Sequence, residues 1–474
     1  MAGVVAMLTD EQAIPIFVHE TELGKSMSIR HVILYVIAIW GLATLLLAGE
    51  VSGQQWSREG TDWPGFLGPA RDGKSIETGL QFDWTNRPPP LIWSYRVGEG
   101  YGSGSVASGQ FFHFDRDGDE ARLTALNAET GEVLWQFTYP TDYVDIYGFD
   151  GGPRSSPVID GERVYVHGVE GMLHCLDVSN GEVIWKIDTQ EKYGVIQNFF
   201  GVGSTPLVYD DLLITMIGGS PEASQTVPLG QLDRVEPNGS AIVAFNKFTG
   251  EERYRTIDDL ASYCSPVVTQ IEGRDAIIAL CRSALHGFDP RDGEALWQVP
   301  YRATKFESVN ASTPVVFGDR VMITESYGIG GAVLELASES ADFVWADERL
   351  RDASLACHWN TPIVHGGFAW ASHGEGQSNA ELRCIDLGDG SVRWSEPGLT
   401  RSSLTWAQGH LICLGENGRL LALRQSEEQF ELVGEVDSGH LRLVGPCWAA
   451  PVLSHGYLYV RDKNRIFCLD IHDE

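Results

Sequence analysis

An eleven-residue motif that recurs along the chain constrains the fold more than any other feature. Each copy opens with a small residue, places Asn or Asp two positions later and Gly at the seventh position, and ends in an aromatic residue. The copies lie at residues 125–135 (ALNAETGEVLW), 175–185 (CLDVSNGEVIW), 244–254 (AFNKFTGEERY), 287–297 (GFDPRDGEALW) and 384–394 (CIDLGDGSVRW). Their spacing is close to the length of one four-stranded sheet module, so the motif predicts a repeat array.

The motif predicts a strand, a tight turn and a second strand. Gly accepts positive φ without steric cost, and a short Asn or Asp side chain can bond its own backbone, so the middle of the motif suits the turn. The closing aromatic residue lies on the outer strand, where one module alone has nothing to bury it against. We therefore expect each ring to dock on a neighbouring module. These docking residues are Trp93, Trp135, Trp185, Tyr254, Trp297, Trp345 and Trp394, of which Trp345 fits the motif only with a shift.

The starts of the modules can be counted upstream of the motif. A Ser-Pro, Thr-Pro or Ala-Pro step precedes apolar residues at Pro157, Pro206, Pro266, Pro314, Pro362 and Pro451. A degenerate start lies at residues 402–406, and a first start, at residues 103–106, lacks the proline. The sequence therefore predicts eight modules, each with strands A to D.

The third strands of these modules also number eight, but only seven fourth strands follow them. The C strands are centred near Leu126, Leu176, Phe245, Phe288, Leu334, Ile385, Leu423 and Leu469. A segment that begins at Leu91 and ends at Val97 contains Trp93 and can supply the missing strand. We predict an all-β fold, an eight-bladed β-propeller of four-stranded antiparallel blades, with this N-terminal strand completing the last blade. The 53 Gly and 14 Trp residues suit short strands with Gly turns.

The N-terminal region contains an export segment. Residues 32–48 (VILYVIAIWGLATLLLA) carry no charge and follow Lys25, Arg30 and His31. Their length suits either a signal peptide or a short membrane anchor, and a true start at Met27 would favour the signal peptide. The preceding positive residues place the bulk of the chain outside the cytoplasm, in the periplasm or the extracellular space. We divide the chain into a disordered tail (1–30), a signal peptide or anchor (31–49), a leader (50–90) and the propeller (91–474).

Charge and cysteine content exclude several classes of function. The formal net charge of −31 repels nucleic acid and anionic membrane surfaces, so neither is expected as a partner. The eight cysteines include no C-x-x-C pair, so neither a zinc pair nor a redox dithiol is indicated. Cys264 and Cys281 are symmetric about a predicted hairpin turn, and whether they form a disulfide stays open.

We expect the protein to be a monomer.

The motif resembles the tryptophan-docking repeat of the quinoprotein-type, or PQQ-like, β-propellers. More specific matches are residues 62–73 (DWPGFLGPARDG), 199–206 (FFGVGSTP) and 309–314 (VNASTP), which resemble a bacterial family of exported PQQ-like propellers. Two features depart from the family's pattern, because Trp345 is shifted and the seventh module lacks both Gly and Trp. The resemblance implies the propeller fold, and it places pyrroloquinoline quinone (PQQ) and Ca²⁺ among the possible cofactors.

Loop lengths indicate which face binds. In a propeller blade the D-to-A and B-to-C connections lie on one face, and the long or irregular loops here are all of this kind. They span residues 140–155, 189–204, 218–240, 325–332 and 373–381. Loops on a rigid scaffold are the usual place for binding, so we predict a ligand site at this mouth of the channel.

Residues just ahead of the A strands are expected to ring that mouth. They are Tyr101, Arg154, Phe200, Tyr263, Asn310, His358, Trp359, Arg401 and Trp448. Aromatic rings with two arginines and a histidine suit a planar anionic ligand. Packing of the rings as an ordinary cap on the channel explains the same pattern.

Signals for metals and catalysis are weak. Asp115, Asp117 and Asp119 stand at alternate positions like the ligands of a calcium loop, but the distal Glu of an EF-hand is absent and a solvated turn explains them as well. The histidines have no zinc spacing. No catalytic Ser motif, P-loop or paired carboxylates stand out.

Three functions fit these observations. The first is a non-catalytic exported propeller that binds an envelope protein or a small ligand, as the barrel-assembly lipoprotein propeller with the same repeat type does. The second is a PQQ-dependent dehydrogenase of alcohols or sugars; such enzymes usually carry adjacent cysteines, which this chain lacks. A third is carbohydrate binding. We favour the first, with no catalytic residue assigned.

Overall fold

The computed structural model describes residues 56–196, 200–228, 231–303, 305 and 310–473. The export segment, the alternative start at Met27, Phe199 and Val309 lie outside these residues. Within them, no helix has both the length and the apolar character needed to cross a membrane.

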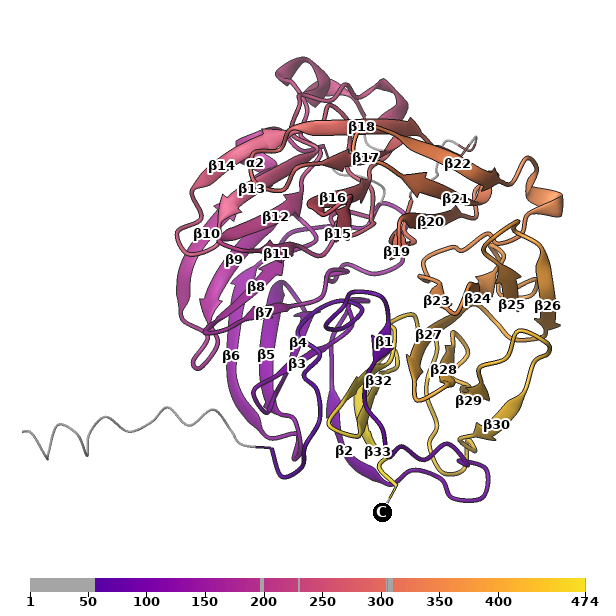
Figure 1. Cartoon of the computed structure of the whole chain (residues 1–474). Coiled ribbons are helices and arrows are strands. Elements are labelled where there is room, and N and C mark those ends of the chain that lie inside the picture. The colour runs from indigo at the N-terminus through magenta and orange to yellow at the C-terminus, as the bar shows by residue number, and fades with distance from the viewer. Residues whose placement is uncertain (1–55, 197–199, 229–230, 304, 306–309, 474) are drawn as a thin grey trace, which may run out of the picture. The chain divides into compact units, whose positions relative to one another are not determined.

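Eight four-stranded antiparallel sheets form a closed ring, as predicted (Figure 1). The first strand of each blade is innermost and the fourth lies on the outside. Blades 1 and 2 contain β3 (Ser105–Ala107), β4 (Gln110–Asp117), β5 (Glu120–Asn127), β6 (Val133–Pro140), β7 (Val158–Asp160), β8 (Arg163–His167), β9 (Met172–Asp177) and β10 (Val183–Asp188). Blades 3 and 4 contain β11 (Leu207–Tyr209), β12 (Leu212–Met216), β13 (Ile242–Asn246), β14 (Glu252–Thr256), β15 (Val267–Ile271), β16 (Arg274–Leu280), β17 (Ala284–Phe288) and β18 (Ala295–Pro300).

The second half of the ring continues the same order. Blades 5 and 6 contain β19 (Val315–Phe317), β20 (Arg320–Glu325), β21 (Gly330–Leu336), β22 (Ala341–Ala346), β23 (Ile363–His365), β24 (Phe368–His373), β25 (Glu381–Asp386) and β26 (Val392–Pro397). Blade 7 contains β27 (Ser402–Ala407), β28 (His410–Gly415), β29 (Leu420–Arg424) and β30 (Leu432–Glu435), and blade 8 contains β31 (Val452–Ser454), β32 (Tyr457–Arg461) and β33 (Arg465–Asp470). Helical elements are short and lie in the loops: α2 (Thr189–Tyr193), η1 (Glu222–Thr226), η2 (Leu232–Arg234) and η3 (Leu350–Asp352).

A strand from the N-terminal side completes blade 8. Strand β2 (Leu91–Arg96) pairs with β33, and Trp93 lies opposite Cys468. Val97 follows the strand and donates its backbone N–H to Asn464 at 2.9 Å. The predicted closure is therefore confirmed, and it joins both ends of the propeller in one sheet.

The motif aromatics dock between blades. The Trp93 indole N–H donates to the Ala128 carbonyl in the next blade at 2.9 Å, and Trp135 donates to Val178 at 3.0 Å. The same bond to the following blade is made by Trp185, Tyr254, Trp345 and Trp394. The motif Gly of the next blade lies under the ring: a Cβ on Gly181 would stand 2.5 Å from the Trp135 ring. Gly181 has φ of 74°, so the position requires glycine for the turn and for the ring.

Two irregular modules show what the motif normally supplies. The turn of blade 5, between β21 and β22, has no motif Gly, and the indole N–H of Trp297 in blade 4 is buried without a hydrogen-bond partner among the described residues. In blade 7 the leader compensates: Trp84, 1% exposed, packs over Gly434 at the place of the missing ring.

The leader is part of the propeller core. Its residues bond to the inner edges of five blades, and β1 (Lys74–Ser75) adds a parallel strand beside β27 (Figure 1). These bonds join Trp63 to Val106, Pro64 to Ile159, Arg71 to Pro206, Lys74 to Val364 and, through β1, Trp406 to Lys74. Residues 63–75 therefore run across the central channel.

All eight cysteines are free and buried. The Cys264 thiol donates to the Ser312 carbonyl at 3.0 Å. Burial raises the pKa of the Cys281 thiol well above its ordinary range. The Cys264–Cys281 disulfide, which the sequence left open, is absent from the structure.

Candidate functional site

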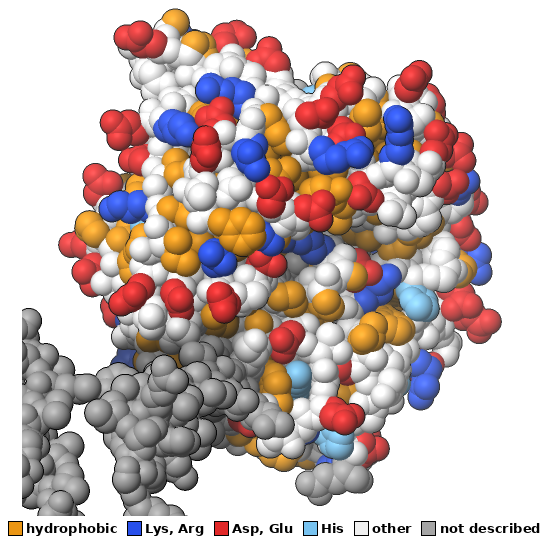
Figure 2. All heavy atoms as spheres, turned by 60° about the vertical axis from the view of Figure 1, so that its left-hand side comes forward, with side chains coloured by type: hydrophobic (Ala, Val, Ile, Leu, Met, Phe, Trp, Pro, Cys, Tyr) orange, Lys and Arg blue, Asp and Glu red, His pale blue; other side chains and the backbone are white. Residues whose placement is uncertain are grey.

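The long loops converge on one face, as predicted. Residues 141–157 and 189–206 are D-to-A connections, and residues 217–241 and 374–380 are B-to-C connections. The expected loop at 325–332 is only 326–329, because Glu325 ends β20 and β21 already begins at Gly330. On the face that Figure 2 shows, acidic and basic side chains are interspersed with hydrophobic ones.

A cavity of about 460 Å³ lies at the channel mouth, and we call it the mouth cavity. Eight of the nine predicted mouth residues line it: Tyr101, Arg154, Phe200, Tyr263, His358, Trp359, Arg401 and Trp448. Asn310 does not; it is 2% exposed and its side-chain amide donates to the Cys281 carbonyl at 2.7 Å. The neighbouring Ala311 takes its place in the wall.

Aromatic rings make up much of the wall. Trp448 is the centre of one group, with ring centroids 4.5 Å from Tyr101 and 5.1 Å from Trp359. Phe200 is the centre of another, 5.9 Å from Tyr263. These spacings are typical of stacked or edge-to-face pairs. The cavity therefore offers ring faces and edges to an apolar or aromatic guest.

Arg401 is neutralised by a carboxylate within the wall. Its guanidinium donates to both carboxylate oxygens of Glu416, at 2.9 and 2.6 Å, and the two side chains are only 14% and 7% exposed. The same carboxylate accepts the Trp448 indole N–H at 2.9 Å. The guanidinium carbon lies 4.3 Å from the Trp359 ring centroid. Arg401 thus holds two rings in place and has no uncompensated charge to offer.

Arg154 is also paired with a buried carboxylate. It pairs with Asp145 at 2.9 Å, and their side chains are 11% and 3% exposed. It also donates to the carbonyls of Gly152 and Asp150. The prediction of two arginines that bind an anion overlooked these acidic partners, which come from the 141–157 loop and from the β28–β29 connection of blade 7.

His358 is a neutral hydrogen-bond junction in the wall. Arg401 can only donate, so its contact with His358 Nδ1 at 3.1 Å makes that nitrogen an acceptor. The Nε2–H then donates to the Tyr327 hydroxyl at 2.7 Å. Burial, with Arg401 and Lys305 nearby, lowers the pKa of His358 to about 4. Both ring nitrogens are occupied, so His358 is not poised as a general base.

Several wall residues escaped the sequence analysis. Tyr147 and Phe149 lie on the 141–157 loop, 45% and 61% exposed, and Phe149 is 6.5 Å from Trp448. Phe66 and Leu67 enter from the leader. In the sequence these residues stood out only because they lie in a long loop or in the leader motif at residues 62–73. No local pattern predicts that the leader lies inside the channel.

The calcium candidates are engaged by an arginine. Arg122 donates to Asp115 at 3.0 and 2.8 Å and to Asp117 at 2.6 Å, across the β4–β5 hairpin. The Asp119 side chain is fully exposed. A guanidinium therefore occupies the position that a cation would take between the first two carboxylates.

One other group of potential metal ligands occurs among the described residues: Asp259, Cys281 and His286, all buried. His286 Nε2 and Asp259 Oδ2 are 3.1 Å apart, and Asp259 also accepts two backbone N–H groups. The group is hydrogen-bonded without a metal, and it does not line the mouth cavity.

PQQ and its metal do not fit the mouth cavity. A tricarboxylate needs cations that are not already paired, and both arginines in the wall are bound to buried carboxylates. A metal needs converging donors, and no group of three potential ligands among the described residues faces this cavity. The arrangement suits the binding of a neutral guest by stacking.

Comparisons with known proteins agree with the fold. The family model described as outer membrane protein assembly factor BamB matches residues 119–396. BamB of Yersinia pestis is 23% identical over 322 residues, which cover 65% of this chain and 71% of that protein.

Solved structures share the architecture at low identity. BamB from Moraxella catarrhalis superimposes with a TM-score of 0.53 at 12% identity, covering 81% of this chain and 98% of that one. A europium-containing methanol dehydrogenase superimposes with a TM-score of 0.64 at 10% identity, covering 84% and 89%. At these identities the likeness shows the fold alone. The family-model match spans more than half of the 474 residues, and the chain therefore belongs to the PQQ-repeat β-propeller family described as outer membrane protein assembly factor BamB.

Proposed function

We propose that this protein is an exported, non-catalytic propeller that binds a partner through the mouth cavity. The observation that carries the proposal is the pairing of both wall arginines with carboxylates inside an aromatic cavity. Such a wall stacks on a neutral apolar or aromatic group and offers no uncompensated cation to an anion. Export rests on the apolar segment 32–48.

The partner we favour is a protein segment of the cell envelope. Val144, Ile146, Tyr147 and Phe149 are exposed on the loop beside the cavity, at 71%, 37%, 45% and 61%. Exposed apolar side chains next to a cavity are typical of protein-binding surfaces, where a central aromatic anchor fills a pocket. An aromatic side chain of the partner would enter the cavity while its backbone lies on this loop. Binding of a small neutral ligand or a sugar by the same rings is the alternative.

Calorimetric titration tests this proposal. The probes are a neutral peptide with alternating aromatic residues, a cello-oligosaccharide, and PQQ with Ca²⁺. We expect the peptide to bind and Phe149→Ala to weaken it about tenfold, the loss typical of an aromatic contact. Phe343→Ala is the matched control, since Phe343 is 47% exposed on β22. Binding of PQQ but not of the peptide would refute the proposal, as would equal effects of the two variants.

A further inference from the structure

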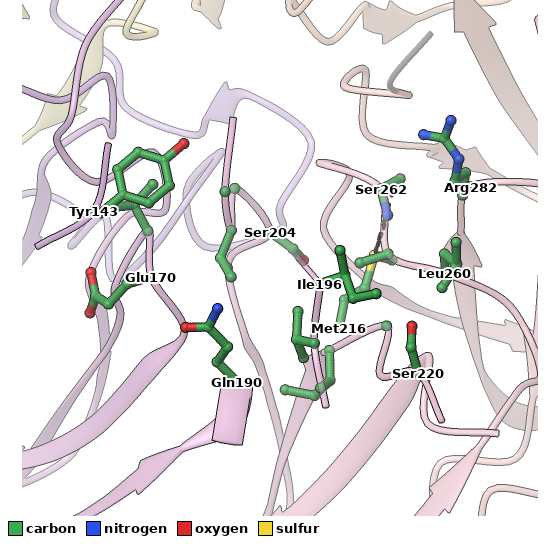
Figure 3. Close-up of a pocket in the computed structure, with 18 of the residues that line it drawn as sticks. Tyr143, Glu170, Gln190, Ile196, Ser204, Met216, Ser220, Leu260, Ser262 and Arg282 are labelled. Atoms are coloured by element: carbon green, nitrogen blue, oxygen red, sulfur yellow. Dashed lines mark hydrogen bonds between the residues drawn. The ribbon is translucent and has the colours of Figure 1, made fainter. Parts of the chain in front are cut away.

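A second cavity of the loop face, separate from the mouth cavity in all but one wall residue, lies between blades 2, 3 and 4 (Figure 3). Its volume is about 370 Å³, within the range of small-ligand sites. We call it the blade 2–4 cavity. Apolar side chains form much of its wall, among them Val169, Val195, Ile196, Met216, Ile217 and Leu260. A few polar groups interrupt that wall, and they indicate what the cavity binds.

Glu170 brings a carboxyl group into this wall that has no counterion among the described residues. It lies in the β8–β9 turn and accepts hydrogen bonds from the Tyr139 hydroxyl at 2.7 Å and the Thr141 hydroxyl at 3.2 Å. No Lys, Arg or His of the described residues forms an ion pair with it. Burial raises the pKa of the Glu170 carboxyl, against the effect of these two hydrogen bonds. A carboxylate in this position gains from a cation inside the cavity.

The chain fixes this carboxylate in place. Gly168, in the same turn, has no side chain, and a Cβ there would stand 2.1 Å from the Tyr139 hydroxyl oxygen and 2.2 Å from Glu170 Oε1. Any larger residue would displace the hydrogen-bonded pair. Glu170 is therefore held at the wall by Tyr139 and Thr141 from the end of blade 1.

Two serine hydroxyls in the same wall have no hydrogen-bond partner among the described residues. Ser204 and Ser220 are 2% and 3% exposed, and neither Oγ forms a hydrogen bond with the described residues. A buried hydroxyl without a partner costs stability, so such groups usually serve a ligand or an ordered water. They come from two separate loops of blade 3, the connection that leads into β11 and the B-to-C loop, and both line this cavity.

Figure 3 shows how these groups lie. Glu170 and Tyr143 are on one side of the view and Arg282 is on the other, with Ser204, Ile196 and Met216 between them. Arg282 is 4% exposed, and burial lowers its pKa to about 10, so it stays a cation at neutral pH. The cavity thus has an acidic side, an apolar middle and a basic side.

We propose that the blade 2–4 cavity binds an apolar primary ammonium compound, an amino acid or the N-terminus of a short peptide, with its ammonium group on Glu170. The hydroxyls of Ser204 and Ser220 bond the polar atoms next to the ammonium, and the apolar wall takes the side chain. In a short peptide, the C-terminal carboxylate extends towards the side of the cavity on which Arg282 lies. This site does not depend on binding in the mouth cavity.

The ligand class is tested by titration of the whole protein with four probes: L-leucine, L-leucinamide, isovalerate and the tripeptide Leu-Gly-Gly. Leucine and leucinamide carry the ammonium and are expected to bind, whereas isovalerate lacks it and is not. If the tripeptide binds more tightly than leucine, the site takes a peptide end, and if less tightly, a free amino acid. Isovalerate binding as well as leucinamide, or no binding by any probe, would overturn the proposal.

Variants separate a binding role from a structural one. Glu170→Gln keeps the hydrogen-bond acceptor but not the charge, and we expect it to weaken leucinamide at least tenfold. Glu182→Gln makes the same change in charge on an exposed residue of the same blade and should leave binding unchanged.

Ser204→Ala and Ser220→Ala give a second readout. Each removes an unpartnered hydroxyl, so the melting temperature of the ligand-free protein should stay constant or rise while affinity for leucinamide falls. Loss of stability with unchanged affinity would show that the hydroxyls serve the fold, and it would contradict the proposal.

Discussion

The guanidinium of Arg401 is bound by both oxygens of the Glu416 carboxylate, at 2.9 and 2.6 Å, inside the wall of the mouth cavity. In the sequence Arg401 looks like a residue that binds an anion. In the structure Glu416 neutralises its charge, and the pair positions the rings of Trp359 and Trp448. Removing one partner leaves a buried charge alone, which costs more than removing both.

Glu416→Gln should therefore lower the free energy of unfolding by about 3 kcal/mol, because it strands the buried Arg401 charge. The double variant Arg401→Met with Glu416→Gln should lose less than the sum of the two single variants. Urea denaturation of the four proteins measures the coupling. Additive losses would show that the two side chains act independently.

Trp135→Ala should lower the free energy of unfolding by about 3 kcal/mol, through loss of ring packing on Gly181 and of the bond to the Val178 carbonyl. Peptide binding in the mouth cavity should be unchanged, since Trp135 lies on the outer strand of blade 1. Leu134→Ala, 41% exposed on the same strand, is the control. A Trp135 variant as stable as the wild type would contradict the docking role.

The strands were predictable from the sequence because the repeat is local. An eleven-residue window contains the turn, its Gly and its aromatic residue, and the unpaired eighth C strand pointed to Trp93. The leader was not predictable, because its bonds join distant residues: Lys74 pairs with Trp406, and Trp84 covers Gly434. No local pattern marks such contacts.

The sequence predicted which residues lie at the channel mouth, but not that acidic side chains pair with the arginines among them. Residues ahead of the A strands must meet at the mouth of a propeller, and eight of nine do so. Their partners come from elsewhere: Asp145 lies on the loop after blade 1, and Glu416 follows β28. The residues predicted at the mouth therefore included two arginines but not the carboxylates that pair with them.

Protonation of His358 links stability to pH. Its pKa is about 4 in the folded protein, against 6.5 for the ordinary side chain. Between these two pH values the unfolded chain binds more protons than the folded protein does. The contribution of neutral His358 to the free energy of unfolding is therefore complete above pH 6.5 and is lost as the pH falls towards 4. His358→Gln should reduce the fall in the free energy of unfolding between pH 6.5 and pH 4. His472→Gln, the control at an exposed position, should leave that fall unchanged. If the free energy of unfolding falls equally with pH in the wild type and in His358→Gln, His358 is not the group responsible.

Addition of PQQ and Ca²⁺ to the purified protein, followed by absorbance spectroscopy and a dye-linked alcohol oxidation assay, separates binding from catalysis. With Arg154 and Arg401 already paired, we predict the spectrum of free quinone and no oxidation of alcohol. Stoichiometric binding of the quinone together with turnover would contradict a non-catalytic propeller.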